Sequence, residues 1–179
     1  MAGVSPRAAR RARRGGSNAI EFALVGLPFF FMLFAIMEVG LIFVTDSILD
    51  NATSQSARLI RTGQAAGSNM TAGQFKTELC NRMGIFSGDC PGRATVDVRV
   101  LAQFRNQTPP DPTANGTSFD DSDLTYVTGE PGSLVLVRVW YKQPLITPLM
   151  AQALSRLKDD NALLVATAAF RNEPYAPTS

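Results

Sequence analysis

Residues 22–44 read FALVGLPFFFMLFAIMEVGLIFV, an apolar stretch interrupted by a single charged side chain, that of Glu38. As an α-helix this stretch would be roughly 34 Å long at about 1.5 Å per residue, enough to cross a bilayer. A chain of 179 residues is too small to bury such a helix on all sides. We therefore expect residues 17–45 to form a transmembrane helix. Proline removes a backbone hydrogen bond, so Pro28 predicts a kink in it.

The segment before this helix is strongly basic. Five of the 17 basic residues fall in the first 14 positions: Arg7, Arg10, Arg11, Arg13 and Arg14. Positive charge on this side of a span predicts a cytoplasmic N-terminus, with residues from about 46 onward exported. Without residues 1–16 the chain keeps 12 basic and 15 acidic residues, a net charge of −3. That balance argues against nucleic acid as a partner.

The composition also argues against an enzyme. The chain has no histidine, which excludes histidine-based triads, imidazole bases and histidine-ligated metals. Two cysteines cannot build a structural zinc site, and no glycine-rich phosphate loop is present. We therefore expect no catalytic residues, no metal and no cofactor.

A secretory signal peptide is the alternative interpretation of the N-terminal segment. Signal peptides have a short apolar region and small residues before the cleavage site. Here the apolar region is long, and Glu38 lies where a signal peptide would have finished. The sequence therefore favours a retained membrane helix.

Glu21 lies at the entrance of the apolar helix, where a carboxylate is costly unless it is neutralised. It is the fifth residue after Gly16, counting Ser17 as the first, and Phe22 follows it. Basic residues, a glycine, four residues, a glutamate, an aromatic residue and an apolar helix form the layout of a type IV prepilin leader. In such leaders a membrane peptidase cuts after the glycine, on the cytoplasmic side.

Cleavage after Gly16 would create an α-amino group at Ser17 that is cationic at neutral pH. In an apolar filament core, Glu21 of one subunit could then pair with that amine of a neighbour, which would set the axial register of the subunits. The alternative is that Glu21 only complements the dipole at the start of the helix.

Residues 16–40, GSNAIEFALVGLPFFFMLFAIMEVG, resemble the TadE-like family of minor pseudopilins, which belong to the Flp/Tad (tight adherence) pilus machinery. The resemblance continues into residues 51–61, NATSQSARLIR, and residues 169–175 are similar to endings found in that family. Type IV pilins proper more often begin with Phe or Met, so Ser17 as the first mature residue fits the Tad subgroup better.

The resemblance implies processing by a prepilin peptidase after Gly16 and a role in pilus assembly, with surface attachment as the outcome. It implies other Tad pilins or pseudopilins, the assembly platform and the membrane as partners. The expected location is the bacterial inner membrane with a periplasmic domain, and incorporation into the extracellular pilus is an option. The alternative function is an uncleaved, membrane-anchored periplasmic binding or scaffold domain.

Glu38 has two interpretations. The resemblance implies a weak intramembrane polar contact with another subunit. Alternatively, Glu38 lies near the outer headgroup level, where a carboxylate costs little.

Residues 46–63 are expected to continue the helix, with Gly63 as its stop. One apolar stripe runs along this part: Ile48, Leu49, Ala52, Ala57, Leu59 and Ile60. Residues 65–69 resemble a small-residue linker, and residues 71–83 suit a short helix capped by Thr71. Cys80 and Cys90 would most economically form a disulfide in an exported domain, worth about 2–3 kcal/mol, with free thiols as the alternative.

Three strands are expected, at residues 95–104, 133–142 and 160–171, and residues 144–158 suit a short amphipathic helix through Leu149, Ala153, Leu154 and Leu157. The long connection at residues 106–132 is predicted to be a mobile, solvated acidic loop. Its Asp120, Asp121 and Asp123 do not fit a calcium-loop template. The predicted fold class is α+β and pilin-like: a long helix packed on a small antiparallel sheet, with residues 64–179 as the domain.

Overall fold

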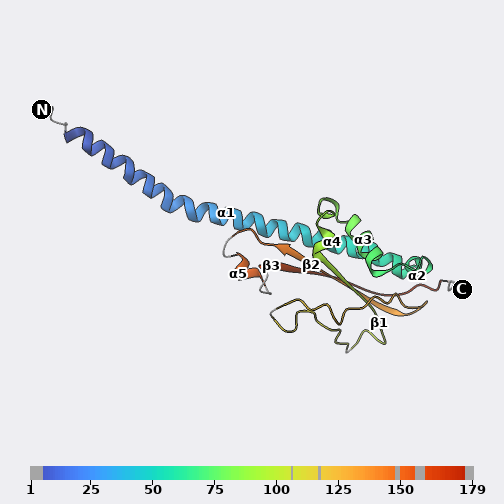
Figure 1. Cartoon of the computed structure of the whole chain (residues 1–179). Helices are drawn as coiled ribbons and strands as arrows, with labels where there is room; N and C mark the ends of the chain where they lie inside the picture. Colours follow the sequence, from blue (N-terminus) through green and yellow to red (C-terminus); the bar gives the residue numbers. More distant parts are fainter. Residues whose placement is uncertain (1–5, 106, 117, 148–149, 156–159, 176–179) are drawn as a thin grey trace.

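Figure 1 shows a computed structural model of the chain, in which one long helix extends away from a small α+β domain. The structure describes residues 6–105, 107–116, 118–147, 150–155 and 160–175, with side chains from residue 19 onward. The helices are α1 (Pro6–Arg61), α2 (Gln64–Gly67), α3 (Ala72–Asn81), the 3-10 helix η1 (Gly84–Phe86), α4 (Cys90–Arg93) and α5 (Met150–Leu154). The strands are β1 (Ala94–Leu101), β2 (Leu134–Pro144) and β3 (Asn161–Arg171). The predicted fold class is confirmed.

Helix α1 is longer than the sequence predicts at its N-terminal end. It begins at Pro6, because the alanine- and arginine-rich residues that follow are good helix formers. It continues unbroken through Pro28 and bends in its N-terminal half (Figure 1). It ends at Arg61, and Gly63 takes a left-handed conformation with φ of 77°, which confirms the predicted stop.

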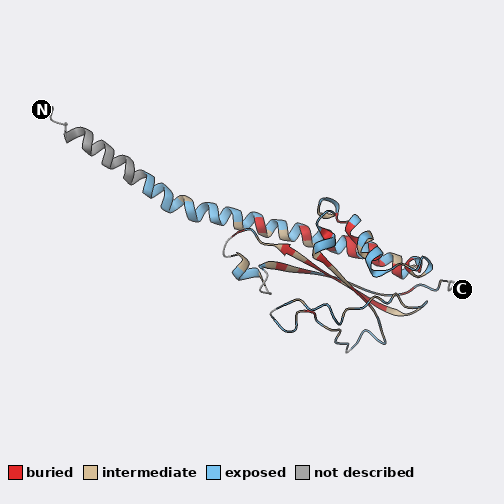
Figure 2. Cartoon of the chain, in the orientation of Figure 1, coloured by how far each residue is buried: buried red, intermediate tan, exposed pale blue. Residues whose placement is uncertain are grey.

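The two halves of α1 have different surroundings, as Figure 2 shows. The large apolar side chains between Ile20 and Met37 are exposed, and this stretch is long and apolar enough to cross a membrane. Beyond it, one face of the helix is buried in the domain. The predicted stripe is confirmed, since Leu49, Ala52, Ala57 and Ile60 are buried and Ile48 and Leu59 are partly buried. The same face also buries Thr45, Thr53 and Ser56, which the apolar pattern does not reveal.

The sheet is antiparallel throughout, in the order β1-β2-β3. Rows of side chains across the strands face α1 and α3: Val96, Val139 and Ala166, and Val98, Val137 and Ala168. β1 ends three residues earlier than predicted, because Leu101 pairs with Leu134, the first residue of β2, and no further partner remains.

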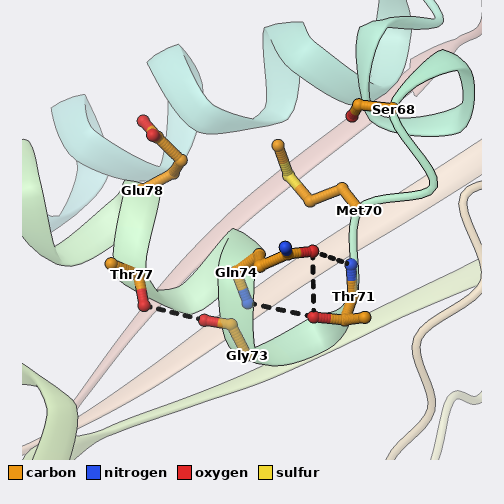
Figure 3. Close-up of a pocket in the computed structure, with 7 residues that line it drawn as sticks. All are labelled: Ser68, Met70, Thr71, Gly73, Gln74, Thr77 and Glu78. Atoms are coloured by element: carbon orange, nitrogen blue, oxygen red, sulfur yellow. Dashed lines mark hydrogen bonds between the residues drawn. The ribbon is translucent and has the colours of Figure 1, made fainter.

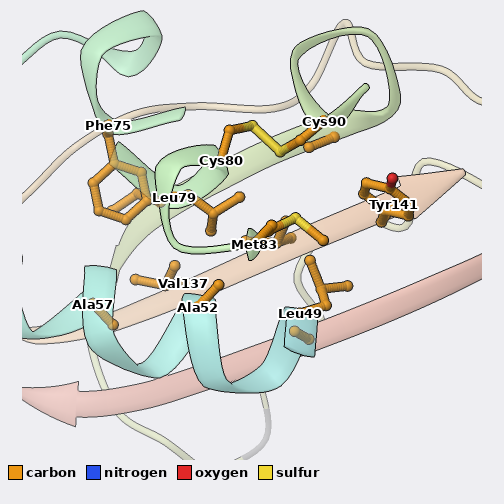
Figure 4. Close-up of a cluster of buried hydrophobic side chains, with 14 of the residues drawn as sticks. Leu49, Ala52, Ala57, Phe75, Leu79, Cys80, Met83, Cys90, Val137 and Tyr141 are labelled. Carbon is orange, nitrogen blue, oxygen red and sulfur yellow. A yellow bond between two sulfur atoms is a disulfide. The ribbon is translucent and has the colours of Figure 1, made fainter. Parts of the chain in front are cut away.

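Figure 4 shows the core between α1, α3 and the sheet. Leu49 and Ala52 of α1 meet Phe75 and Leu79 of α3 over Val137 of β2. The disulfide between Cys80 and Cys90, with Cα atoms 5.4 Å apart, joins the end of α3 to α4 at the edge of this core and is the pairing predicted.

The connection from α1 to α3 differs from the predicted linker. Residues 64–67 form the short helix α2, because backbone hydrogen bonds from Gly67 to Gly63 and from Ser68 to Gln64 close one helical turn. Helix α3 starts with the predicted cap, shown in Figure 3: the Thr71 hydroxyl accepts from the Gln74 N–H at 3.3 Å, and the Gln74 side chain accepts from the Thr71 N–H at 2.8 Å.

The long connection between β1 and β2 lies along the edge of β1, where Tyr126 forms a parallel bridge with Val98, and its Phe119 covers part of the other face of the sheet. It is fixed rather than free at Thr125 and Val127, because Val98 of β1 donates its N–H to Thr125 at 2.8 Å and accepts from Val127 at 2.8 Å. The Phe119 ring packs on the edge of the Trp140 ring, with centroids 6.0 Å apart. This packing makes the connection part of the domain.

The C-terminal segment returns to the end of α1. The Glu173 N–H donates to the Arg61 carbonyl at 2.9 Å, and the two side chains form an ion pair at 3.0 Å. The Asn172 amide donates to the carbonyls of Thr128 and Glu130. The segment therefore ties α1 to the long connection. Helix α5 lies within the predicted helical range, with Ala153 and Leu154 exposed, whereas Leu149 and Leu157 lie outside the described residues.

Candidate assembly site on the N-terminal helix

The predicted leader and register residues all lie on α1. Gly16 and Ser17 belong to its helical backbone, and their side chains lie outside the described part of the chain. Glu21 and Phe22 are exposed. The Phe22 ring lies along the helix above Gly26, where an added Cβ would be 3.7 Å from it. This part of α1 thus presents an aromatic and a carboxylate to its surroundings.

Two carboxylates lie along the exposed apolar surface of α1, which continues past Glu38 to Phe43 and Val44. Glu21 and Glu38 are 17 residues apart, a rise of roughly 26 Å along the helix axis, and no charged residue lies between them. That rise is close to the thickness of about 30 Å of a bilayer hydrocarbon core. The geometry therefore suits a helix whose middle is in lipid, with Glu21 near one surface of the bilayer and Glu38 within the opposite leaflet.

Among the side chains of α1 that the structure describes, Glu38 is the first that the domain buries. It is buried, although the side chains before it on α1 are exposed. Its carboxylate accepts a hydrogen bond from the Ile146 N–H and another from the Thr147 N–H at 3.0 Å, both in the turn that follows β2. Each carboxylate oxygen therefore has a donor from this same chain, a contact over more than 100 residues that the sequence does not reveal.

An open apolar hollow of about 700 Å³ lies beside this contact. Three of the side chains that line it come from α1 on the N-terminal side of Glu38: Phe31, Phe34 and Met37. Leu41 and Ile146 complete its apolar wall. Among the described residues that line the hollow, Glu38 is the one charged side chain, and both of its oxygens already accept hydrogen bonds, so the hollow suits apolar chains better than polar ligands.

A buried ionic cluster lies on the sheet face under the long connection. Asp97 is 0% exposed and binds Arg99 at 2.6 Å and Arg138 at 2.8 Å. The Thr125 N–H also donates to it at 3.0 Å. Burial opposes ionisation of Asp97, but hydrogen bonds from Arg99, the Thr125 backbone and Arg138 outweigh it and hold the pKa of this carboxyl below its ordinary value.

The geometry of the ionic cluster indicates a structural role. The Arg138 guanidinium lies 4.7 Å from the centre of the Trp140 ring, which packs against Phe119 of the connection. The cluster therefore fixes the connection to the sheet. The only sequence signal for it is the opposite charge of Asp97 and Arg99 on the polar side of a predicted strand, with Arg138 among valines in the next.

The acidic residues of the long connection do not gather into a site. Asp120, Asp121 and Asp123 are exposed, and within the described ranges no three histidine, cysteine, aspartate or glutamate side chains lie close enough to hold a metal ion. The Asp120 side chain instead accepts from the Ser122 N–H at 3.0 Å, as in a local turn.

The structure defines a class of α+β protein with one exposed apolar helix, suited to membrane anchoring, and a small domain packed on its second half. Residues 16–58 match the model of a family described as TadE-like protein, which confirms the predicted resemblance over that segment and associates the chain with Tad pilus systems. The matched segment begins at Gly16 and covers most of α1, and stops before the sheet. No curated protein and no solved structure significantly matches the chain.

Proposed function

We propose that the chain is a minor pseudopilin that acts in assembly of a Tad-type pilus. Its precursor is cleaved between Gly16 and Ser17 by a prepilin peptidase, and the apolar helix stays on the mature protein. One observation carries the proposal: α1 keeps its apolar side chains exposed from Ile20 to Met37, while one face of the same helix from Glu38 onward is packed in the domain. Lipid, and then neighbouring helices, would cover that surface.

The matched family segment includes Gly16, Ser17 and the apolar helix, the part of the chain in which the proposed cleavage falls. Cleavage would remove the five leader arginines, which hold the N-terminus on the cytoplasmic side. The mature helix would then keep one α-amino group and the Glu21 carboxylate at that end. Extracting the mature helix from the bilayer therefore costs much less free energy than extracting the precursor, whose five arginines would have to cross the apolar core.

The register of assembly would come from Glu21. In an apolar helix bundle, a carboxylate and an amine that pair across two subunits avoid two uncompensated charges. A neighbour shifted along the axis would leave both charges unpaired, so the pair selects one axial offset. The Cys80–Cys90 disulfide is in keeping with a periplasmic domain, since oxidising compartments preserve such bonds.

The test compares three variants in the native host. Gly16→Ala should leave the precursor uncleaved, so that the intact mass keeps the leader and pili are lost. Gly40→Ala is the matched control, because an added Cβ there meets nothing within 4 Å, and its chain should start at Ser17. Glu21→Ala should be cleaved normally and fail in assembly.

The outcomes separate the proposal from an uncleaved anchor. A wild-type chain that keeps its leader in membranes would mean an anchored binding or scaffold domain. Normal pilus formation by both Gly16→Ala and Glu21→Ala would contradict the pseudopilin mechanism.

A further inference from the structure

We propose that the connection between β2 and β3, at residues 145–147 and 150–154, is a second membrane contact that dips into the outer leaflet beside α1. The inference rests on the proposed function, in which α1 spans the bilayer. The partner of this connection is lipid, at the boundary between the acyl chains and the headgroups, and not a soluble ligand.

The first argument is position along the helix. The Ile146 and Thr147 backbone bonds to Glu38 hold the connection beside that residue. Yet the apolar surface of α1 does not stop there, because Phe43 is 69% exposed and Val44 is 51% exposed. These side chains lie roughly 8–9 Å further along the helix axis. The connection is therefore flanked by exposed apolar helix on both sides, at a depth where the helix itself requires lipid.

The second argument is the character of the connection. The sequence from Gln143 to Ser155 contains no charged residue. Ile146 is 82% exposed, and unlike a singly exposed aliphatic residue it lines one apolar hollow together with Phe34 and Met37 of α1. Met150 shares an apolar hollow with Met32 and Ile36 of α1, so the connection and the helix form one continuous apolar surface.

The third argument is the backbone. A turn at membrane depth needs partners for its N–H groups, because lipid supplies none. Glu38 provides them for Ile146 and Thr147. In turn, the two N–H groups stabilise a carboxylate that would otherwise be costly in an apolar stretch. The contact thus satisfies both the N–H groups of the turn and the carboxylate of Glu38. In water neither group would need a protein partner.

The experiment places a tryptophan at three positions of the full chain, reconstituted in phosphatidylethanolamine and phosphatidylglycerol vesicles that contain brominated lipids. Bromine quenches only nearby indoles. Ile146→Trp tests the connection, and Phe30→Trp reports the middle of the span. Ile85→Trp is the matched control, since Ile85 is 86% exposed and lies in η1, which joins α3 to α4, and Figure 1 shows these two helices away from α5. The emission of the natural Trp140, measured in the parent chain, is subtracted.

We expect lipids brominated near the headgroup to quench most of the emission added at 146, lipids brominated deep in the chain to quench 30, and neither to quench 85. Quenching at 30 without quenching at 146 would overturn the membrane contact and leave the span intact. No quenching at 30 would overturn the span together with the inference.

Two further outcomes would also overturn the lipid contact. Quenching at 85 as strong as at 146 would mean a nonspecific approach of the domain to the vesicle. Blue-shifted but unquenched emission at 146, at every protein-to-lipid ratio, would mean that a second copy of the chain covers the connection.

Discussion

The ring of Tyr175 lies against Gly63, the residue that ends α1, so closely that a Cβ built on Gly63 would be 2.5 Å from the ring. The same glycine has a φ of 77°, which L-residues rarely adopt. The end of α1 and the packing of the C-terminal segment therefore both require a residue without a side chain at position 63.

Gly63→Ala should destabilise the domain. The left-handed backbone alone costs about 1–3 kcal/mol for a residue with a side chain, and the added Cβ would also displace Tyr175. The measurement is denaturant unfolding of the full chain in detergent micelles. Gly73→Ala is the control, because its Cβ would meet nothing within 4 Å. Equal stabilities of these two variants would contradict the packing of Tyr175.

Asp97→Asn should destabilise the domain much more than a surface change. It leaves the Arg99 and Arg138 guanidiniums without their buried counter-charge, a loss of about 3–5 kcal/mol. The exposed Asp121→Asn is the matched control and should change stability by less than about 0.5 kcal/mol. Chemical unfolding followed by Trp140 fluorescence measures both. A near-neutral Asp97→Asn would show that the cluster does not hold the long connection.

Acid should weaken the same cluster. Because the folded pKa of Asp97 lies below its ordinary value, its contribution to stability is complete above about pH 4 and is lost as the pH falls through the folded pKa. The free energy of unfolding of the wild type should therefore fall more steeply below pH 4 than that of Asp97→Asn. Parallel pH profiles of the two proteins would contradict the lowered pKa.

Loss of the disulfide should weaken the domain without changing its fold. The bond closes a loop with a sequence separation of 10, so its removal should cost about 2–3 kcal/mol. Both cysteines are buried, and the double substitution Cys80→Ala and Cys90→Ala fills their sites with an apolar side chain. Thermal unfolding compares this variant with the wild type, oxidised and reduced. A reduced wild type as stable as the oxidised protein would contradict the prediction.

Glu38→Ala should release the turn after β2. The amides of Ile146 and Thr147 lose their acceptors, and the buried Thr147 donor alone costs about 1–3 kcal/mol when it is left unsatisfied. Hydrogen exchange followed by mass spectrometry should show faster exchange in a peptide that contains residues 145–147. Glu21→Ala is the control on the same helix and should leave that peptide unchanged. Unchanged exchange in Glu38→Ala would contradict the contact.

The local elements of this fold were predictable from the sequence, because each has a signal within a few residues. Thr71 and Gln74 mark the start of α3, Gly63 marks the end of α1, and alternating valines mark β1 and β2. The apolar stripe on α1 likewise follows from helical spacing.

The long-range polar contacts were not predictable, because each joins residues that are ordinary in their local setting. Glu38 resembles an isolated charge in a span until the turn after β2 is brought beside it. Asp97 and Arg99 resemble the solvent side of a strand until the long connection covers them. The small polar Thr53 and Ser56 on the buried face of α1 break the apolar pattern for the same reason: only the arrival of the sheet buries them.

The position of β3 affects how the chain matures. This strand packs along α1, and the segment after it binds Arg61, 112 residues earlier in the chain. The first helix to be synthesised is thus covered by the last strand. At about 5–20 residues per second, the ribosome needs roughly 5–25 s to make the intervening sequence, and until then the sheet that covers the inner face of α1 is incomplete. A chain that ended before β3 would leave that face of α1 exposed, and proteases would cleave it more readily than the complete domain.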